Sequence, residues 1–288
     1  MRWQEGRRST NVEDQRGTGG RKIAIGGGIG LLIMLGIALL SGADPATLIG
    51  MIAGGGDGSF SMDGVTQTGT ISAAEAQLAD FVSVVLADTE DTWQGIFQES
   101  GMTYLQPKLV LFSGGVDSAC GYAESATGPF YCPDDEKVYI DLSFYQDLKD
   151  QYGAPGDFAQ AYVISHEVGH HVQNLLGTLD EVHQLQARSD EVTGNRYSVM
   201  LELQADCYAG VWANHADRTR HIIETGDVEE ALNAASQIGD DTLQKQSRGY
   251  VVPDSFTHGT SAQRMRWFQA GIDSGDTGSC DTFHAAVL

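Results

Sequence analysis

Positive charge is scarce in most of this chain. No lysine or arginine occurs between Lys22 and Lys108, and the residues after 22 carry 11 cations against 36 acids. Such an acidic surface repels the phosphates of nucleic acids, so we do not expect nucleic acid as a partner. A solvated acidic surface is the simplest interpretation; attraction of cationic substrates and adaptation to salt are the alternatives.

Long hydrophobic runs are also lacking, with one exception. Residues 23–40 contain no charged side chain and would span about 27 Å as a helix, enough to cross the hydrocarbon core of a membrane. Six cations precede this run, so the positive-inside rule predicts a single-pass anchor with a basic cytoplasmic segment over 1–22 and the rest of the chain outside. A cleaved signal peptide is the alternative, because residues 41–43 form an acceptable cleavage site. We favour the anchor, since the segment before the run is long for a signal peptide.

The chain has only four cysteines: Cys120, Cys132, Cys207 and Cys280. Their spacing includes no C-x-x-C, which argues against a zinc site made of thiolates. All four follow the hydrophobic run, and an even number outside the cytoplasm is typical of disulfides. Of the three possible pairings we favour Cys120 with Cys132, because the Gly-Pro sequence at 128–129 predicts a turn between them. Cys207 then pairs with Cys280.

The hydrophobic pattern divides the rest of the chain. Residues 41–71 are rich in glycine and serine and predict a linker, and the folded domain is expected over 72–288. Ser72 and Glu75 form a capping box for a first helix, which we expect to continue with breaks to Phe97. Further helices are expected at 157–176, 193–215, 227–247 and 261–271, and strands at 109–112 and 137–142. The predicted fold class is α+β, mostly helical with a small β-sheet, behind a single transmembrane helix.

The most specific feature of the sequence is the run HEVGH at 166–170. Positions i and i+4 lie on one face of a helix, so His166 and His170 direct their rings to one point, and Glu167 flanks it. Two imidazoles are suitable ligands for Zn²⁺, and a carboxylate beside the ion can accept a proton from activated water. This spacing is the H-E-x-x-H motif of zinc peptidases.

The surrounding residues predict the helix that this motif requires. Asp157 follows a Gly-Pro loop and is a candidate N-cap, and Gly177 stands where a glycine often ends a helix. Gly169 lies inside the helix, at a cost of about 1 kcal/mol relative to alanine. A glycine at this position would allow another backbone or a substrate to approach the metal-binding face closely.

A catalytic zinc site needs a third protein ligand, and Glu202 is our candidate. Glu202 and Asp206 are also at i and i+4, within an otherwise apolar helix, where two unpaired carboxylates would be costly. One carboxylate can bind the metal while the other accepts the free ring N–H of a histidine ligand. An ordinary solvated acidic face is the alternative.

These segments resemble the zincins with a glutamate ligand, and the whole chain resembles a bacterial family of neutral zinc metallopeptidases. The likeness is carried by MRWQEGRRSTNVED, the hydrophobic run, YCPDDEKVYIDLSFY, AYVISHEVGHHVQN, LELQADCYAGVWA and HGTSAQRMRWF. The resemblance implies a zincin-like catalytic domain with one Zn²⁺ per chain, held by His166, His170 and Glu202, and Glu167 as the catalytic base. Together with the anchor it implies a protein of the bacterial inner or cytoplasmic membrane, with its catalytic domain periplasmic or extracellular.

His258 is a further candidate. Thr260 and Gln263 form a capping box for the last helix, so His258 lies just before a helix N-terminus, where we expect the dipole to lower its pKa. A neutral imidazole there could donate a hydrogen bond to the oxyanion of a tetrahedral intermediate, and related zincins resemble this arrangement. A structural or surface histidine is the alternative. His171 points about 100° away from the ligands, so we expect it to contact a neighbouring element. The remaining histidines, His183, His215, His221 and His284, are interpreted as surface residues.

Residues 113–118 read SGGVDS, which matches the phosphate-binding loop of ATP pyrophosphatases. The segment that follows is interrupted by glycine, and strands and helices do not alternate around it. We therefore interpret this run as a hairpin turn and expect no nucleotide.

The sequence thus favours a membrane-anchored zinc peptidase that acts on a peptide or protein substrate. The strand at 138–141 could hold an extended substrate by edge pairing. The alternatives are a catalytically latent zinc-binding adaptor or chaperone outside the cytoplasm, and a zinc storage or sensing protein. Glu167 argues against the adaptor, because a structural zinc site gains nothing from a carboxylate beside the metal. Zinc storage or sensing would favour a larger cluster of histidines.

Overall fold

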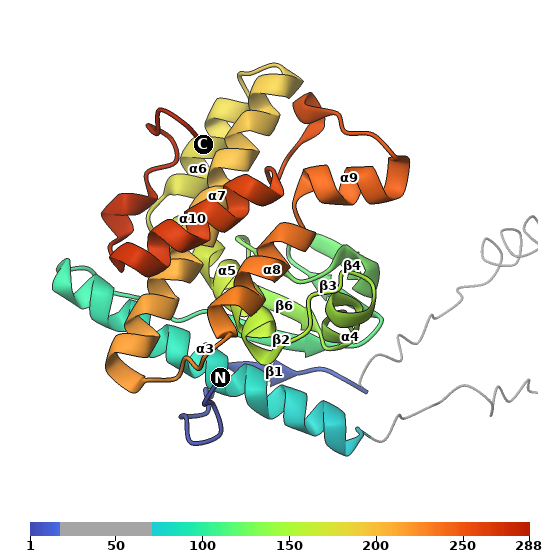
Figure 1. Ribbon diagram of the computed structural model, residues 1–288. Coiled ribbons are helices and arrows are strands. Elements are labelled where there is room, and N and C mark those ends of the chain that lie inside the picture. The colour runs from blue at the N-terminus through green and yellow to red at the C-terminus, as the bar shows by residue number, and fades with distance from the viewer. Residues whose placement is uncertain (18–70) are drawn as a thin grey trace, which may run out of the picture. The chain divides into compact units, whose positions relative to one another are not determined.

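Helices form most of the fold, as the sequence pattern predicts (Figure 1). The computed structural model describes residues 1–17 and 71–288. The helices are α3 (Ala73–Glu99), α4 (Ser143–Asp150), α5 (Asp157–Leu175), α6 (Thr178–Gln186), α7 (Glu191–Arg220), α8 (Asp227–Gln237), α9 (Asp240–Arg248) and α10 (Ser261–Ser274). Short 3₁₀ turns lie at Ser125–Thr127, Pro253–Ser255 and Thr277–Cys280. For these residues, the predicted class of a mostly helical α+β protein is confirmed.

One small sheet has four strands in the order β1-β2-β6-β5. The strands are β1 (Val12–Asp14), β2 (Lys108–Phe112), β5 (Phe130–Cys132) and β6 (Lys137–Asp141). β1, β2 and β6 run parallel, and β5 runs antiparallel to β6. β6 is therefore an internal strand, and the edge pairing that we expected at 138–141 is not possible there. The edge strand that contacts α5 is β5.

β2 is buried on both faces of the sheet, as its uninterrupted apolar run predicts. Leu109 and Leu111 face the core shared with the helices. Val110 and Phe112 face a smaller apolar cluster, to which the neighbouring hairpin contributes Val116. The sheet thus lies between the helical core and a minor layer.

The SGGVDS run lies in a hairpin, but it supplies the first strand, and the turn that we expected within it follows at residues 119–120. β3 (Gly115–Ser118) pairs antiparallel with β4 (Gly121–Glu124). The backbone N–H of Gly114, which has a positive φ of 78°, donates to the Asp141 carboxylate at 2.8 Å. The predicted disulfide between Cys120 and Cys132 joins the tip of this hairpin to β5.

Residues 1–17 belong to the same compact unit as residues 71–288. Met1 and Trp3 are buried in the main core, where the Trp3 ring packs edge-on against Phe81 at 5.4 Å. Val12 begins a strand that pairs with β2. This differs from the separate basic segment expected over 1–22. A strand of three residues is too short to show the alternating pattern of a β-strand, and one buried tryptophan gives no periodicity. The arginines around them, in contrast, suggest a basic segment.

Several helix boundaries differ from those expected. α3 is unbroken, and the helix expected at 227–247 is two helices, α8 and α9, with Gly239 between them. A Cβ on Gly239 would lie 2.4 Å from the backbone nitrogen of Ser261, so the contact with α10 requires glycine at this turn. α5 begins at Asp157 itself, with Gly156 as the N-cap, and Gly177 has the left-handed conformation expected after its end.

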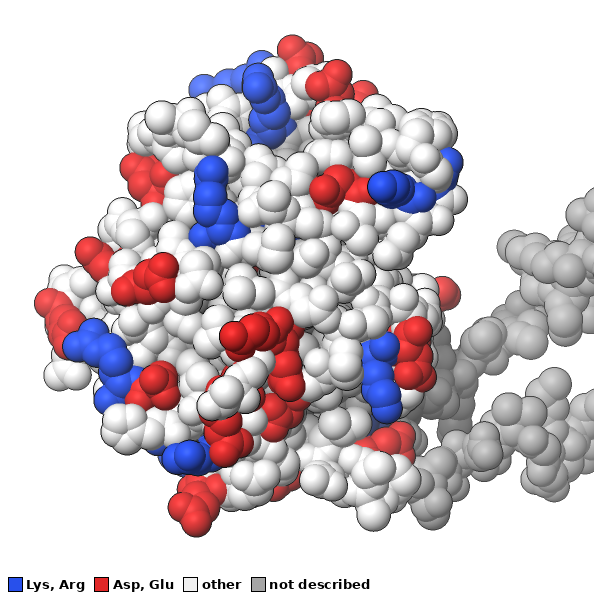
Figure 2. All heavy atoms as spheres, in the orientation of Figure 1, with Lys and Arg blue, Asp and Glu red and all other residues white. Residues whose placement is uncertain are grey.

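The proposed anchor at 23–40 and the proposed linker, up to residue 70, lie outside the described residues. Among the described residues, no helix is both long enough and apolar enough to cross a membrane. On the face drawn in Figure 2, acidic side chains are spread over the surface among fewer basic ones.

Candidate metal centre

The candidate site lies where α5 and α7 pack against each other. Both helices are apolar around the contact, and Gly169 of α5 faces the backbone of α7. A Cβ at this position would lie 3.0 Å from the carbonyl oxygen of Ala205. The glycine that the sequence singled out therefore allows α7 to approach closely enough to add a ligand to those of α5.

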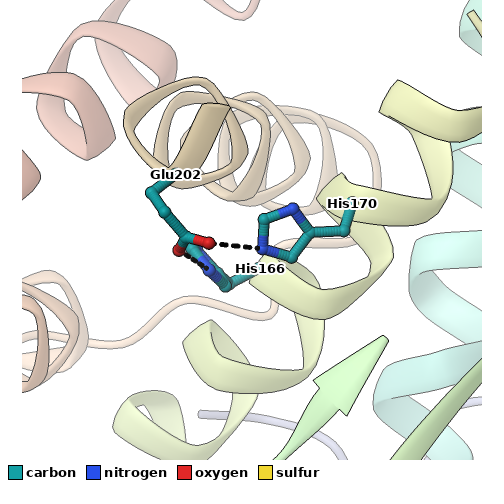
Figure 3. A group of neighbouring side chains, drawn as sticks. All are labelled: His166, His170 and Glu202. Carbon is teal, nitrogen blue, oxygen red and sulfur yellow. Dashed lines mark hydrogen bonds and ion pairs between the residues drawn. The ribbon is translucent and has the colours of Figure 1, made fainter. Parts of the chain in front are cut away.

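Figure 3 shows the side chains of His166 and His170 from α5 and Glu202 from α7 converging on one point. Nε2 of His166 lies 3.1 Å from one carboxylate oxygen of Glu202, and Nε2 of His170 lies 3.4 Å from the other. One candidate ligand atom from each residue falls within 4.8 Å of the other two. The structure thus brings together all three ligands that the sequence predicted.

A buried network of charged and polar side chains orients the His166 ring through its Nδ1 atom. Its Nδ1 donates to a carboxylate oxygen of Asp206 at 2.8 Å, which leaves Nε2 directed at Glu202. Arg264 donates to both oxygens of Asp206 at 2.8 and 2.9 Å, and the Tyr162 hydroxyl donates to one of them. Asp206 is fully buried, and Arg264 offsets the free-energy cost of burying its negative charge. The hydrogen bond from His166 to Asp206 has the geometry that the predicted orienting role of Asp206 requires.

Two close contacts between α7 and α10 bring Arg264 to this place. A Cβ on Gly210 would lie 2.1 Å from the carbonyl oxygen of Phe268, and one on Gly271 would lie 2.0 Å from that of Cys207. The disulfide between Cys207 and Cys280, also as predicted, joins α7 to the 3₁₀ turn that follows α10. The backbones of α7 and α10 thus pack in close contact.

His170 has an orienting partner as well. Its Nδ1 donates to the side-chain oxygen of Gln173 at 2.9 Å. The amide nitrogen of Gln173 donates in turn to the carbonyl oxygen of Leu201 at 2.7 Å and to Gln204 at 3.1 Å. Both histidines therefore direct Nε2 into the site, and each is tied to α7 through its other nitrogen.

The electrostatics of the site favour a cation between the three residues. Burial lowers the pKa of His166, but the charges of Asp206 and Glu202 outweigh this and raise it to about 10. Burial raises the pKa of Glu202, but the two histidines bring it well below its usual value. For Asp206, burial is likewise outweighed by Arg264 and His166, and its pKa falls to about 2. The two carboxylates thus stabilise positive charge at the rings, whether a proton or a metal ion carries it.

The site opens into a cleft with a volume of 840 Å³. Glu167 lines this cleft beside the ligands and is itself buried. Burial raises its pKa, against the opposing effect of the charges on His166 and His170. A carboxylate with a raised pKa is a stronger base near neutral pH, as proton abstraction from water requires. Phe130, Phe144 and Tyr152 give one part of the cleft an aromatic lining.

His258 lines the same cleft, but its electrostatic setting differs from our expectation. Its Nδ1 lies 3.4 Å from a carboxylate oxygen of Asp240, the first residue of α9. That carboxylate also accepts the backbone N–H groups of His258 and Gly259, at 2.6 and 3.0 Å. The hydrogen bond to Asp240 raises the pKa of His258, so the predicted lowering by the helix dipole is wrong. The capping box at Thr260 and Gln263 is present as expected.

Two other histidines have clear positions. His171 is fully buried, donates from Nε2 to the carbonyl oxygen of Leu105 at 2.6 Å and accepts from the Tyr131 hydroxyl at 3.0 Å. It therefore joins α5 to β5 and to the segment after α3, as expected for a residue that contacts neighbouring elements. His183, which we interpreted as a surface residue, lines the cleft from α6.

No sequence pattern predicted three further residues of the site, Arg264, Gln173 and Asp240. Arg264 and Asp240 lie about 60 and 40 residues after Glu202, so no helical spacing relates them to the ligands. Gln173 does follow His170 at i+3, the spacing of neighbours on one helix face. That spacing was the one available signal.

The donor set fits Zn²⁺ better than the hard cations. Two imidazole nitrogens and one carboxylate oxygen are the three protein ligands of many catalytic zinc sites, whereas Ca²⁺ and Mg²⁺ prefer oxygen alone. Three ligands leave a position open towards the cleft, which is typical of a catalytic rather than a structural ion.

The donor set, the open position and the spare carboxylate of Glu167 define the class of site found in zinc peptidases. The chain belongs to the family described as "Putative neutral zinc metallopeptidase", which it matches over residues 1–283. This confirms the resemblance seen in the sequence, and the family implies a zinc cofactor and a peptide or protein substrate.

Two relatives illustrate the extent of the similarity. The chain is 52% identical over 293 residues to "Uncharacterized protein YpfJ" of Escherichia coli (strain K12), with 100% of both chains covered. It is 42% identical over 218 residues to "Uncharacterized protein Mb2605" of Mycobacterium bovis, covering 72% of this chain and 73% of the relative. No solved structure matches the chain significantly.

Proposed function

We propose that this protein is a zinc-dependent peptidase that hydrolyses peptide bonds at the α5–α7 site. One observation carries the proposal: a carboxylate, Glu167, lies beside a three-ligand set whose remaining side opens into a large cleft. A structural metal site would be closed by a fourth protein ligand and would not need this carboxylate.

The roles of the residues follow from their positions. His166, His170 and Glu202 would hold one Zn²⁺, which when bound supplies a Lewis acid for the scissile carbonyl and for water. Glu167 accepts the proton of the attacking water and passes it to the nitrogen of the leaving amine. Its raised pKa suits both halves of this transfer.

His258 would stabilise the negative charge that develops on the carbonyl oxygen. The hydrogen bond to Asp240 raises the pKa of His258, which favours a charged donor over the neutral donor expected from the sequence. A charged donor forms a stronger hydrogen bond to an oxyanion. Asp240 holds His258 in place through both backbone and side-chain contacts.

The substrate would be an extended peptide in the cleft. β5 is the sheet edge at the cleft, since its residues Phe130 and Tyr131 line the cavity, and an edge strand can pair with a peptide backbone. The aromatic part of the lining would favour large apolar side chains in the substrate. We also retain the proposal that residues 23–40 attach the protein to the bacterial cytoplasmic membrane, with the catalytic domain outside the cytoplasm.

Removal and return of the metal tests this function. The full chain is purified in detergent, its zinc is measured, and cleavage of a peptide library is compared before chelation, after chelation and after addition of one equivalent of Zn²⁺. We expect cleavage to be lost and regained with the metal, and His170→Gln to lose both metal and cleavage. Bound zinc without cleavage of any peptide would favour the adaptor alternative instead.

A further inference from the structure

The first 17 residues are built into the domain that carries the site. Val12, Glu13 and Asp14 align with Leu109, Val110 and Leu111 of β2 as a parallel edge strand. The N–H of Leu109 donates to the carbonyl oxygen of Asn11 at 2.9 Å, and the N–H of Gln15 donates to that of Leu111 at 2.8 Å. These backbone bonds continue the sheet and do not depend on side-chain identity.

Apolar and polar side chains attach the same segment to α3. Trp3 is buried against Phe81, and the hydroxyl of Ser9 donates to the buried carboxylate of Glu90. The side-chain nitrogen of Asn11 donates to the same oxygen of Glu90 at 2.8 Å and to Gln106 at 2.9 Å. The segment therefore buries Trp3 in the core and donates hydrogen bonds to the buried carboxylate of Glu90.

The arginines of this segment also have partners in the described residues. Arg2 pairs with Glu224 at 3.2 Å, and Arg8 pairs with Asp80 at 2.6 Å. Arg7 reaches both Glu90 and Asp91 at 2.8 Å, and Arg16 pairs with Asp14 at 2.6 Å. Three of the six cations that suggested a cytoplasmic N-terminus thus pair with acids of residues 71–288, and Arg16 pairs with an acid of its own segment.

The chain leaves and returns to the domain at nearly the same place. Arg16, at the end of the first described segment, donates from Nη1 to the carbonyl oxygen of Glu75 at 2.9 Å. Glu75 is in the first turn of α3, which begins two residues after Ile71, where the described chain resumes. Ile71 and Gly17 therefore lie at one end of the domain.

We propose that residues 1–17 and 71–288 lie on the same side of the membrane, outside the cytoplasm. A bilayer with a hydrocarbon core of about 30 Å cannot pass between groups that are joined by hydrogen bonds. A single crossing between residues 17 and 71 is therefore incompatible with this fold, and any membrane attachment made there begins and ends on one face. The two disulfides place that face in an oxidising compartment. This inference rests on the proposed membrane attachment, and it replaces the single-pass topology predicted from the sequence.

Accessibility of single cysteines tests the topology in the full chain. All four native cysteines are in disulfides, so one added cysteine is a unique reporter. Glu5→Cys reports on the first segment and Glu181→Cys on the catalytic domain, and both positions are exposed. Spheroplasts of bacteria that make each variant are treated with a membrane-impermeant maleimide, before and after lysis, and labelling is referred to the denatured protein.

We expect both variants to be labelled before lysis, with less than a twofold increase after it. Labelling of Glu181→Cys before lysis but of Glu5→Cys only after lysis would overturn the inference and restore a single crossing. Labelling of both only after lysis would overturn the outward placement. None of these results depends on peptide cleavage, so failure of the topology is distinguishable from failure of the proposed activity.

Discussion

Arg264 is the residue on which the geometry of the ligands depends most. It neutralises Asp206 inside the protein, and Asp206 in turn fixes the ring of His166. We expect Arg264→Met to lower zinc affinity about 10- to 100-fold, the usual range for partners of metal ligands. Stability should fall by about 3–5 kcal/mol, because a buried carboxylate loses its counter-ion.

Zinc titration against a chromophoric chelator and thermal unfolding measure the two effects. Arg266→Met is the matched control, since Arg266 is exposed on the same helix and should leave both quantities nearly unchanged. Equal effects of the two substitutions would show that Arg264 has no special role.

The contact between Asp240 and His258 predicts a change in pH dependence. Asp240 raises the pKa of His258, and the charged donor becomes a weaker, neutral one as pH rises through that pKa. Asp240→Asn removes the charge but keeps an oxygen for the backbone N–H groups, so the pKa falls. The alkaline loss of kcat should then begin at lower pH than in the parent, and His258→Gln should lack that step. An unchanged alkaline limb in Asp240→Asn would exclude His258 as the charged donor.

Among the single residues of the site, the sequence predicted those that lie on one face of a helix. His166 and His170 are four residues apart, and so are Glu202 and Asp206. Burying an unpaired carboxylate costs free energy, which indicated a function for the two acids. Arg264 could not be found in this way, because its relation to Asp206 exists only after α10 packs on α7. The sign of the pKa shift at His258 was wrong for the same reason, since Asp240 is brought to it by the turn before α9.

Among the elements, the close packing of α5 and α7 is the feature that assembles the site. Gly169→Ala would place a Cβ 3.0 Å from the carbonyl oxygen of Ala205 and force the helices apart. We expect a destabilisation of about 1–3 kcal/mol, as for other overpacked sites, together with weaker zinc binding because Glu202 moves away from the histidines.

Gly194→Ala is a matched control for this change. Gly194 is also inside a helix, α7, but a Cβ there meets nothing within 4 Å. Helix propensity then dominates, and stability should increase by up to about 1 kcal/mol. Thermal unfolding compares the stability of the two variants with that of the parent. An increase in stability for Gly169→Ala would contradict the packing described for the site.

Helical periodicity predicted α5, α7 and α10, since each has a continuous apolar face. It did not predict the division of 227–247 into α8 and α9, because the break at Gly239 is imposed by α10 and not by the local sequence. The edge position of β5 could not be predicted from the sequence either. Strand order depends on pairings between β1, β2 and β6 that are distant in sequence.

For the whole molecule, the incorporation of residues 1–17 sets the limits of the folding unit. A chain that begins at residue 71 would leave β2 as an exposed edge and would remove Trp3 from the core. We expect such a chain to be insoluble or to unfold at a temperature well below that of the parent. The same chain with residues 1–17 joined to residue 71 by a flexible linker of about ten residues should regain the stability of the parent domain. Calorimetry of the two shortened proteins tests this, and equal stability would show that the first segment is dispensable.

The sequence placed the start of the domain near residue 72 because composition changes sharply there. It could not show that the fold also needs the beginning of the chain, since a short strand is recognised only by its partner. Charge has two interpretations at this scale, because Arg2, Arg7 and Arg8, which suggested a cytoplasmic segment, pair with acids of residues 71–288.

The most direct test of the central claim is the comparison of the full-length parent with Glu167→Gln, by zinc content and kcat/KM on one cleaved peptide. Glu167 is beside the ligand set but not part of it, so the substitution should leave one Zn²⁺ per chain. Loss of the base should reduce kcat/KM by about 100-fold or more. A Glu167→Gln protein that keeps both its zinc and its cleavage rate would contradict the account.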